Sequence, residues 1–189
     1  MDIILASDSP RRKEILTNLN IDFISIPSHI DEDGFFDDDP ASRVMLLALE
    51  KAKGVASIVS EPSLIIGADT LVYKDEIIGK PNDDLDAFRI LKELQGGWHE
   101  VLTGLAVIDT KKRQKKVVCE KTSVHMAPMT DRQIKRYIAT GEPENKAGAY
   151  AIQGRAALYI KAIKGCYYNV VGLPVHKLWE VINEFGIEI

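Results

Sequence analysis

The chain has 189 residues, 46% of them hydrophobic and 28% charged, and its formal net charge is -4. This composition predicts one globular domain, or two small lobes that share a core, and an acidic chain lacks the basic face that sequence-independent binding of DNA or RNA requires. It contains no signal peptide and no apolar run of about 18 residues, so we expect no membrane partner. Cys119 and Cys166 lack metal-type spacing, which indicates reduced thiols and a cytoplasmic location.

A short polar stretch, residues 7–12, follows an apolar strand near the start of the chain. The pattern predicts a tight loop and a helix start, with Ser9 as N-cap and Pro10 at the first helical position. Backbone N–H groups at such a turn attract anions, and Arg11 and Arg12 add forked donors that suit phosphate oxygens. We interpret the stretch as a phosphate cradle. An ordinary capped turn with two solvated arginines is the alternative.

An acidic loop, residues 29–39, follows a second predicted strand at residues 20–28 that is broken by Pro27. Acidic runs are usually solvated, and we expect this of most of these side chains. One or two carboxylates are nevertheless enough for Mg²⁺, which takes its remaining ligands from water and substrate phosphates. The loop is therefore a candidate source of a metal ligand.

The next element is a predicted helix over residues 39–57, and Lys51 lies on its apolar stripe. Lys51 is seven residues after Val44, so it points toward the body of the protein, whereas Lys53 points toward solvent. An inward lysine needs a partner. Contact with a phosphate or a carboxylate is one interpretation, and an apolar stem that snorkels at the stripe edge is the other.

Residues 64–73 form the most apolar segment of the chain and predict a central buried strand. Gly67 within it allows another backbone to approach closely. Asp69 is also inside this strand, and a buried carboxylate is costly unless it is paired, hydrogen-bonded or bound to a metal. We therefore predict a functional role for Asp69, with an aspartate at a strand kink as the alternative.

The rest of the chain predicts a hairpin at 74–76, a helix after 82–84, strands at 99–109 and 117–126, a helix at 130–138, a strand at 157–163 and a final helix starting at Pro174. The basic turn at 110–116 is expected to be a solvated hairpin tip. His99 has no second ligand at metal spacing, so it is expected to be structural or to orient substrate by a hydrogen bond. The long loop at 141–155 is rich in Gly, Ala and specific polar residues, which is typical of a functional loop.

Six motifs occur in one order along the chain, at residues 5–12, 67–70, 79–81, 141–150, 152–154 and 171–174. Together they resemble the Maf family of nucleoside triphosphate pyrophosphatases, and the resemblance covers essentially the whole chain. It implies a single Maf-like nucleotide pyrophosphatase domain over residues 1–189. The implied fold is α/β and inosine triphosphate pyrophosphatase-like: an elongated mixed sheet with flanking helices and two lobes around a nucleotide cleft.

The resemblance also implies the reaction, which is hydrolysis of a nucleoside triphosphate between its α and β phosphates to the monophosphate and pyrophosphate, with Mg²⁺ or Mn²⁺. Asp69 resembles the family's proton acceptor, and we expect Glu32 and Asp69 to hold the metal. The expected substrate-binding residues are Ser7, Arg11, Arg12, Lys51, Lys80 and Gln153. Clustered cations, a metal and one general base are the equipment that such a reaction needs.

Three positions in this family indicate the base. Arg11, Thr70 and Gln153 resemble the subgroup that cleaves dTTP and UTP, since the 7-methyl-GTP subgroup has Trp, Gln and Glu there. The neutral amide of Gln153 can both donate to and accept from a pyrimidine edge. One departure is Asn145, where the family usually has Asp, which puts any charge-dependent role of that position in doubt.

The sequence leaves two alternatives open. A nucleotide-sensing regulator of cell division without catalysis would need the cradle but not Asp69, and a broader enzyme would clear modified pyrimidine triphosphates. A kinase or GTPase is disfavoured because the chain has no Walker-type loop. The resemblance further implies a homodimer.

Overall fold

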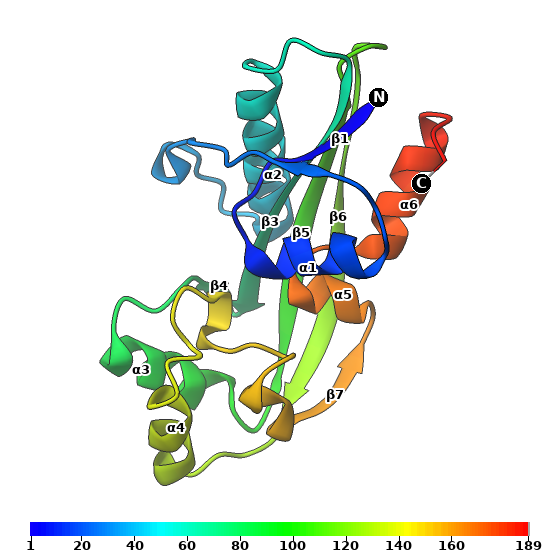
Figure 1. The fold of residues 1–189 in the computed structure, drawn as a ribbon. Helices are drawn as coiled ribbons and strands as arrows, with labels where there is room; N and C mark the ends of the chain where they lie inside the picture. The colour runs from blue at the N-terminus through cyan, green and yellow to red at the C-terminus, as the bar shows by residue number, and fades with distance from the viewer. Residues whose placement is uncertain (189) are drawn as a thin grey trace. The chain divides into compact units, whose positions relative to one another are not determined.

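The computed structural model describes residues 1–188, with the side chain of residue 33 left out. Its strands form, within those residues, one seven-stranded mixed sheet in the order β2-β1-β3-β5-β6-β7, with β4 paired to β3 (Figure 1). β1 is parallel to β2 and β3, whereas β3–β4 and β6–β7 are antiparallel. The predicted α/β fold with a mixed sheet and flanking helices is confirmed.

The chain divides into two compact units, and β3, β5 and β6 each contribute residues to both. The first unit comprises Met1–Asp69, Thr103–Glu120 and the C-terminal segment from Gly172. The second comprises Thr70–Leu102 and Lys121–Val171. No helix within residues 1–188 is both long and apolar enough to cross a bilayer.

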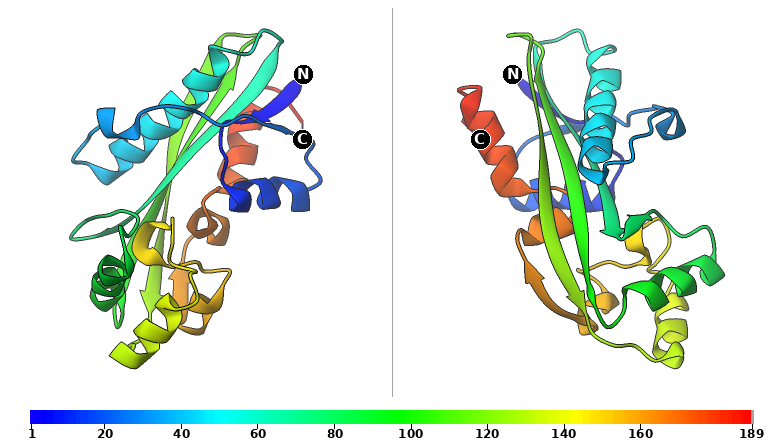
Figure 2. Two further views of the ribbon diagram at one scale, coloured as in Figure 1. Left: turned by 60° about the vertical axis from the view of Figure 1, so that its left-hand side comes forward. Right: turned by 180° about the vertical axis from the view of Figure 1, so that it is seen from behind.

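The first unit contains β1 (Asp2–Leu5), α1 (Pro10–Asn18), β2 (Ile24–Ser25), the 3₁₀ turn η1 (Glu32–Gly34), α2 (Pro40–Ala56) and α6 (Val175–Glu184), with parts of β3 (Ser63–Lys74), β5 (Trp98–Asp109) and β6 (Gln114–Met126). α2 and α6 lie on opposite sides of this part of the sheet (Figure 2). α2 begins as predicted, because the Asp39 side chain accepts a hydrogen bond from the Ser42 amide. Its stripe packs on the sheet at Gly67, where a Cβ would lie 2.2 Å from the Ala48 carbonyl oxygen.

The second unit contains β4 (Glu76–Ile78), α3 (Asp84–Leu94), α4 (Asp131–Ile138), β7 (Ile160–Lys164) and α5 (Tyr167–Val171), and the 3₁₀ turns η2 (Ala147–Ala149) and η3 (Arg155–Leu158). α3 packs against α4 and η2. The predicted capping box of α4 is present, because Thr130 and Gln133 exchange hydrogen bonds. The core of the second unit is one apolar cluster that includes Ile90, Leu91, Leu94, Met126 and Ile134.

Several sequence-based expectations need correction. The strand expected at 20–28 is only the pair Ile24–Ser25, and the first part of the strand expected at 157–163 is η3. α5 was not predicted. The basic turn is not simply solvated, since Lys112 donates to the Phe185 carbonyl and Lys116 pairs with Glu184. Long-range contacts, which no local pattern reveals, decide these segments.

Candidate functional site

The central feature of the first unit is an ammonium group between two carboxylates. Lys51 Nζ lies 2.6 Å from Asp69 Oδ1 and 2.8 Å from Glu32 Oε1. The side chains of Lys51 and Asp69 are only 10% and 14% exposed, whereas that of Glu32 is 47% exposed. Both the inward lysine and the need of Asp69 for a partner are thereby explained by one contact.

Local packing sets this contact. Lys51 is a buried residue of α2 between Ala48 and Ala52 in sequence. These two alanines contact β3 at Gly67, two residues before Asp69. The absence of a side chain at Gly67 lets the helix approach the strand closely enough for Lys51 to reach Asp69. Gly104 on β5 plays the same part for Val44, because a Cβ there would lie 2.0 Å from the Val44 carbonyl oxygen.

The first turn of α1 supplies the second group of cations, and Ser7 in the loop before it contacts one of them. Arg12 is buried; its Nε donates to the Gly172 carbonyl at 2.7 Å and its Nη1 to Ser7 Oγ at 3.2 Å. Ser7 Oγ also accepts from the Ser9 amide at 3.1 Å. Ser9 is at the N-cap and Pro10 in the first turn, as predicted, but the Ser9 side chain makes no capping hydrogen bond. The loop is held by Ser7 and Arg12 instead.

Electrostatics tie the two groups together. Burial lowers the pKa of Arg12, and the carboxylates of Asp69 and Glu32 oppose that shift while Arg11 adds to it. Burial also lowers the pKa of Arg11, although a guanidinium still remains charged at neutral pH. Three cations and two carboxylates therefore influence one another in this region of the first unit, an arrangement suited to a polyanionic ligand.

The two carboxylates also fit a hard cation. Glu32 and Asp69 converge on one ammonium at hydrogen-bond distance, and carboxylate oxygens are the ligands that Mg²⁺ prefers. Among the side chains that the structure describes, which exclude that of residue 33, no group of three or more His, Cys, Asp or Glu is placed to hold a metal. Mg²⁺ needs only one or two carboxylates when phosphates and waters complete its shell, so this pair is a sufficient protein contribution.

Of the predicted residues, the structure brings together Ser7, Arg11, Arg12, Glu32, Lys51 and Asp69 in the first unit. Lys80, Thr70 and Gln153 belong to the second unit, where Thr70 is half-buried and the other two are exposed. Within that unit the Gly148 amide donates to the Gly79 carbonyl at 3.0 Å, so the long loop is tied to the residue before Lys80.

Sequence reasoning missed two groups that support these residues. The Gly172 carbonyl anchors Arg12, and the motif at 171–174 was the only signal for it. Glu142 accepts hydrogen bonds from Tyr137 and from the backbone of Arg155 and Ala156, a contact that only the glycine-rich loop composition hinted at. Asn145 has a φ of 58°, a backbone conformation that both Asn and Asp adopt more readily than most residues.

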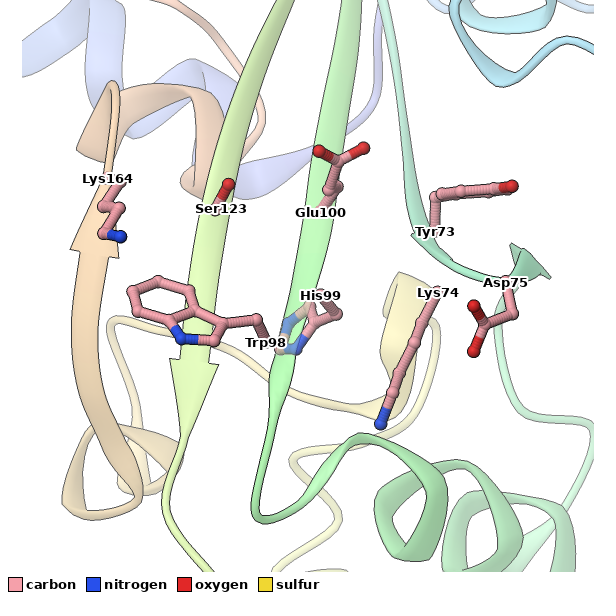
Figure 3. A pocket seen from close by; sticks show the side chains of 8 residues that line it. All are labelled: Tyr73, Lys74, Asp75, Trp98, His99, Glu100, Ser123 and Lys164. Carbon is pink, nitrogen blue, oxygen red and sulfur yellow. The ribbon is translucent and has the colours of Figure 1, made fainter.

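A pocket of about 350 Å³ lies in the second unit, and Figure 3 shows the side chains around it. None of the predicted site residues lines this pocket. Most of its charged side chains already have partners, since Glu100 pairs with Lys121, Lys74 donates to the Glu93 carbonyl and Lys164 lies over the Trp98 ring. His99 also lines it, but its Nε2 contacts Tyr150 Oη at 2.8 Å, which gives His99 a structural role.

Comparison with known proteins gives the family. The model of the family described as "Maf-like protein" matches residues 2–185. The chain belongs to the Maf family. This Maf protein is 52% identical over 182 residues to the dTTP/UTP pyrophosphatase of Alkaliphilus metalliredigens, covering 96% of this chain and 95% of the relative. It is 46% identical to the dTTP/UTP pyrophosphatase of Acetivibrio thermocellus, covering 99% and 96%.

Two solved structures also match this Maf chain. One is a nucleoside-triphosphatase / dITP/XTP pyrophosphatase from Mycobacterium abscessus, with a TM-score of 0.44, 14% identity and coverage of 68% of this chain and 76% of that chain. The other is the Ham1 protein of Staphylococcus aureus, with a TM-score of 0.44, 15% identity and coverage of 67% and 72%.

Proposed function

We propose that this Maf protein is a nucleoside triphosphate pyrophosphatase that hydrolyses dTTP and UTP to the monophosphate and pyrophosphate. The observation that carries the proposal is the Asp69–Lys51–Glu32 cluster beside Arg12, which combines a carboxylate base with cations for phosphate. Full-length relatives at 52% and 46% identity are named dTTP/UTP pyrophosphatases, which supports the same reaction and bases.

Asp69 is the proposed proton acceptor for the attacking water. Its carboxylate is held by Lys51 at 2.6 Å and is largely shielded from solvent, so its position is fixed before substrate binds. A fixed base close to the reacting phosphate avoids the reorganisation that a mobile side chain would need.

The cations neutralise the triphosphate in this proposal. The proposed basic contacts are Arg11, Arg12 and Lys51 of the first unit and Lys80 of the second. The hydroxyl of Ser7 in the first unit is a further proposed contact. Arg12 is pre-positioned by Gly172 and Ser7, which costs less entropy on binding than ordering a free arginine. Charge that builds up on phosphate oxygens during hydrolysis is then met by donors already in place.

Glu32 and Asp69 are the proposed ligands of the divalent cation, Mg²⁺ or Mn²⁺. When bound, such a cation lowers the charge on the phosphates and the pKa of its water. The ammonium of Lys51 lies between the same two carboxylates, so this side chain helps to keep them together in its own right.

Arg11, Thr70 and Gln153 are the proposed base-selective residues. The amide of Gln153 can meet both the donor and the acceptor of a uracil or thymine edge, which an ionised glutamate cannot do. Modified pyrimidine triphosphates that keep this edge fit the same proposal.

The proposal extends to the protein's assembly and surroundings. We propose a cytoplasmic homodimer whose single domain over residues 1–189 binds neither nucleic acid nor membrane. The net charge of -4 supports the absence of a nucleic-acid partner. Sedimentation velocity tests the dimer, which a monomer at assay concentrations would contradict.

Pyrophosphate release from dTTP, UTP, CTP, GTP and 7-methyl-GTP with Mg²⁺ tests the function. Asp69→Asn should lose at least about 100-fold in kcat for dTTP, as expected when a general base is removed. Asp2→Asn, an exposed aspartate on β1, is the matched control and should keep full activity. Binding of dTTP by the wild type without any turnover would replace the enzyme with a nucleotide sensor.

A further inference from the structure

The Glu142 carboxylate and the Tyr137 hydroxyl together hold the two sides of the turn that carries Gln153. Glu142 Oε2 accepts a hydrogen bond from the Arg155 amide at 2.8 Å. Its Oε1 accepts from the Ala156 amide at 3.2 Å and from Tyr137 Oη at 2.7 Å. Tyr137 Oη in turn accepts from the Ala151 amide at 3.2 Å. The backbone is therefore fixed on both sides of Gln153 by one Glu142–Tyr137 clamp.

The turn lies directly on this carboxylate. A Cβ at Gly154 would be 2.3 Å from Glu142 Oε2 and 2.4 Å from its carboxyl carbon, so only glycine leaves room there. The backbone of Glu142 is itself held, because Lys146 Nζ donates to its carbonyl at 2.6 Å. Such contacts leave the peptide next to Gln153 little freedom to move.

Glu142 is ionised and Tyr137 is protonated at neutral pH, as the hydrogen bonds of the clamp require. Burial by itself raises the pKa of Glu142, but hydrogen bonds from Tyr137, Arg155 and Ala156 outweigh it, and the pKa lies below the ordinary value. Burial raises the pKa of Tyr137, so its hydroxyl stays protonated and donates. At neutral pH the clamp therefore consists of an ionised acceptor and three donors.

We propose that Glu142 is a positioning residue for Gln153 and, through it, sets the choice of base, an inference that rests on the proposed function. The Glu142 carboxylate accepts hydrogen bonds from Tyr137 and from two backbone amides, so Glu142 acts on substrate only by holding the turn that carries Gln153. The amide of Gln153 is exposed, and what defines its position is the backbone that Glu142 holds. A small displacement of such a group is enough to lose discrimination between bases.

Glu142→Gln is the test variant because it keeps the size and removes one acceptor. In either orientation of the amide, its NH₂ group faces a backbone N–H donor of Arg155 or Ala156, so one hydrogen bond is lost. Glu144→Gln, an exposed glutamate two residues later, is the matched control. Gln153→Ala and the double variant Glu142→Gln/Gln153→Ala complete a cycle.

We expect the ratio of kcat/KM for dTTP over dCTP to fall in Glu142→Gln, because a Gln153 that is held less firmly discriminates less between bases. The fall should be at most about tenfold, since one hydrogen bond to a charged acceptor limits what the turn can pass on to Gln153. KM for dTTP should carry most of the change, and Glu144→Gln should match the wild type. In the Gln153→Ala background, Glu142→Gln should leave the ratio unchanged. A folded Glu142→Gln with the wild-type ratio, or an equal effect in both backgrounds, overturns the proposal.

Amide hydrogen exchange separates this inference from the proposed function. Arg155 and Ala156 amides should exchange about tenfold faster in Glu142→Gln than in Glu144→Gln, whether or not any nucleotide is hydrolysed. Unchanged exchange refutes the clamp itself. Faster exchange in a protein that hydrolyses none of the nucleotides leaves the clamp in place and refutes the function it was proposed to serve.

Discussion

Replacing Lys51 by methionine removes the ammonium between Asp69 and Glu32 and keeps most of the apolar stem. The Lys51 and Asp69 side chains are 10% and 14% exposed, so the change leaves a carboxylate shielded from water without its partner. Breaking a buried pair in this way costs about 3–5 kcal/mol. Arg12 also attracts Asp69 and offsets part of the loss, so we expect about 3 kcal/mol.

Two further variants complete a double-mutant cycle with Lys51→Met. Asp69→Asn leaves Lys51 paired with Glu32 at 2.8 Å but removes a carboxylate that attracts the buried Arg12, so it should cost about 2 kcal/mol, less than Lys51→Met. The double variant Lys51→Met/Asp69→Asn should be more stable than Lys51→Met alone, because no unpaired charge then remains at position 69.

Urea unfolding followed by circular dichroism at pH 7 measures all of these differences. Lys53→Met is the control, since Lys53 is on the same helix but 47% exposed, and should change stability by less than about 0.5 kcal/mol. The reasoning fails if Lys51→Met is as stable as Lys53→Met, or if the double variant is less stable than Lys51→Met.

Three further predictions follow from separate features of the chain. Burial, with a smaller effect of Lys74, lowers the pKa of His99 to about 4, so below pH 6.5 the unfolded chain binds a proton that the folded chain does not. The free energy of unfolding of the wild type should therefore fall by about 3 kcal/mol from pH 6.5 to pH 4, and that of His99→Gln should fall by less. Urea titrations that show the same pH dependence for both proteins would contradict this. Gly67→Ala places a Cβ 2.2 Å from the Ala48 carbonyl oxygen and should cost about 3 kcal/mol or more in the same unfolding assay, whereas Gly34→Ala, with open space around it, should be nearly neutral; similar stabilities would be evidence against the close helix–strand packing. Excess EDTA should abolish pyrophosphate release and added Mg²⁺ should restore it, because two carboxylates are proposed as metal ligands; activity that survives exhaustive chelation would rule out the metal.

Hydrophobic periodicity was enough to predict which side chains point inward where one face of a helix or strand packs on a core. The apolar stripe of α2 placed Lys51 inward, and the apolar run of β3 marked Asp69 as a charge that needs a partner. That these two residues are each other's partner was not predicted, because the spacing of 18 residues says nothing about how a helix lies on a strand. The close approach at Gly67 decides it.

Tertiary contacts decided the segments that local patterns misjudged. The chain at 155–158 has strand-like neighbours, yet its amides turn toward Glu142 and form η3. Glu32 was chosen as a metal ligand from several carboxylates of the acidic loop, and only the structure shows it beside Lys51. Side-chain hydrogen bonds from distant residues leave no periodic trace in the sequence, which is why the Glu142 clamp and the Gly172 anchor were missed.

Phosphorus NMR of dTTP incubated with the wild-type protein and Mg²⁺ tests the central claim most directly. The account predicts dTMP and pyrophosphate in equal amounts, with at least about 100-fold less of both formed by Asp69→Asn in the same time. Release of dTDP and orthophosphate would show cleavage of a different phosphoanhydride bond and would contradict the proposed reaction.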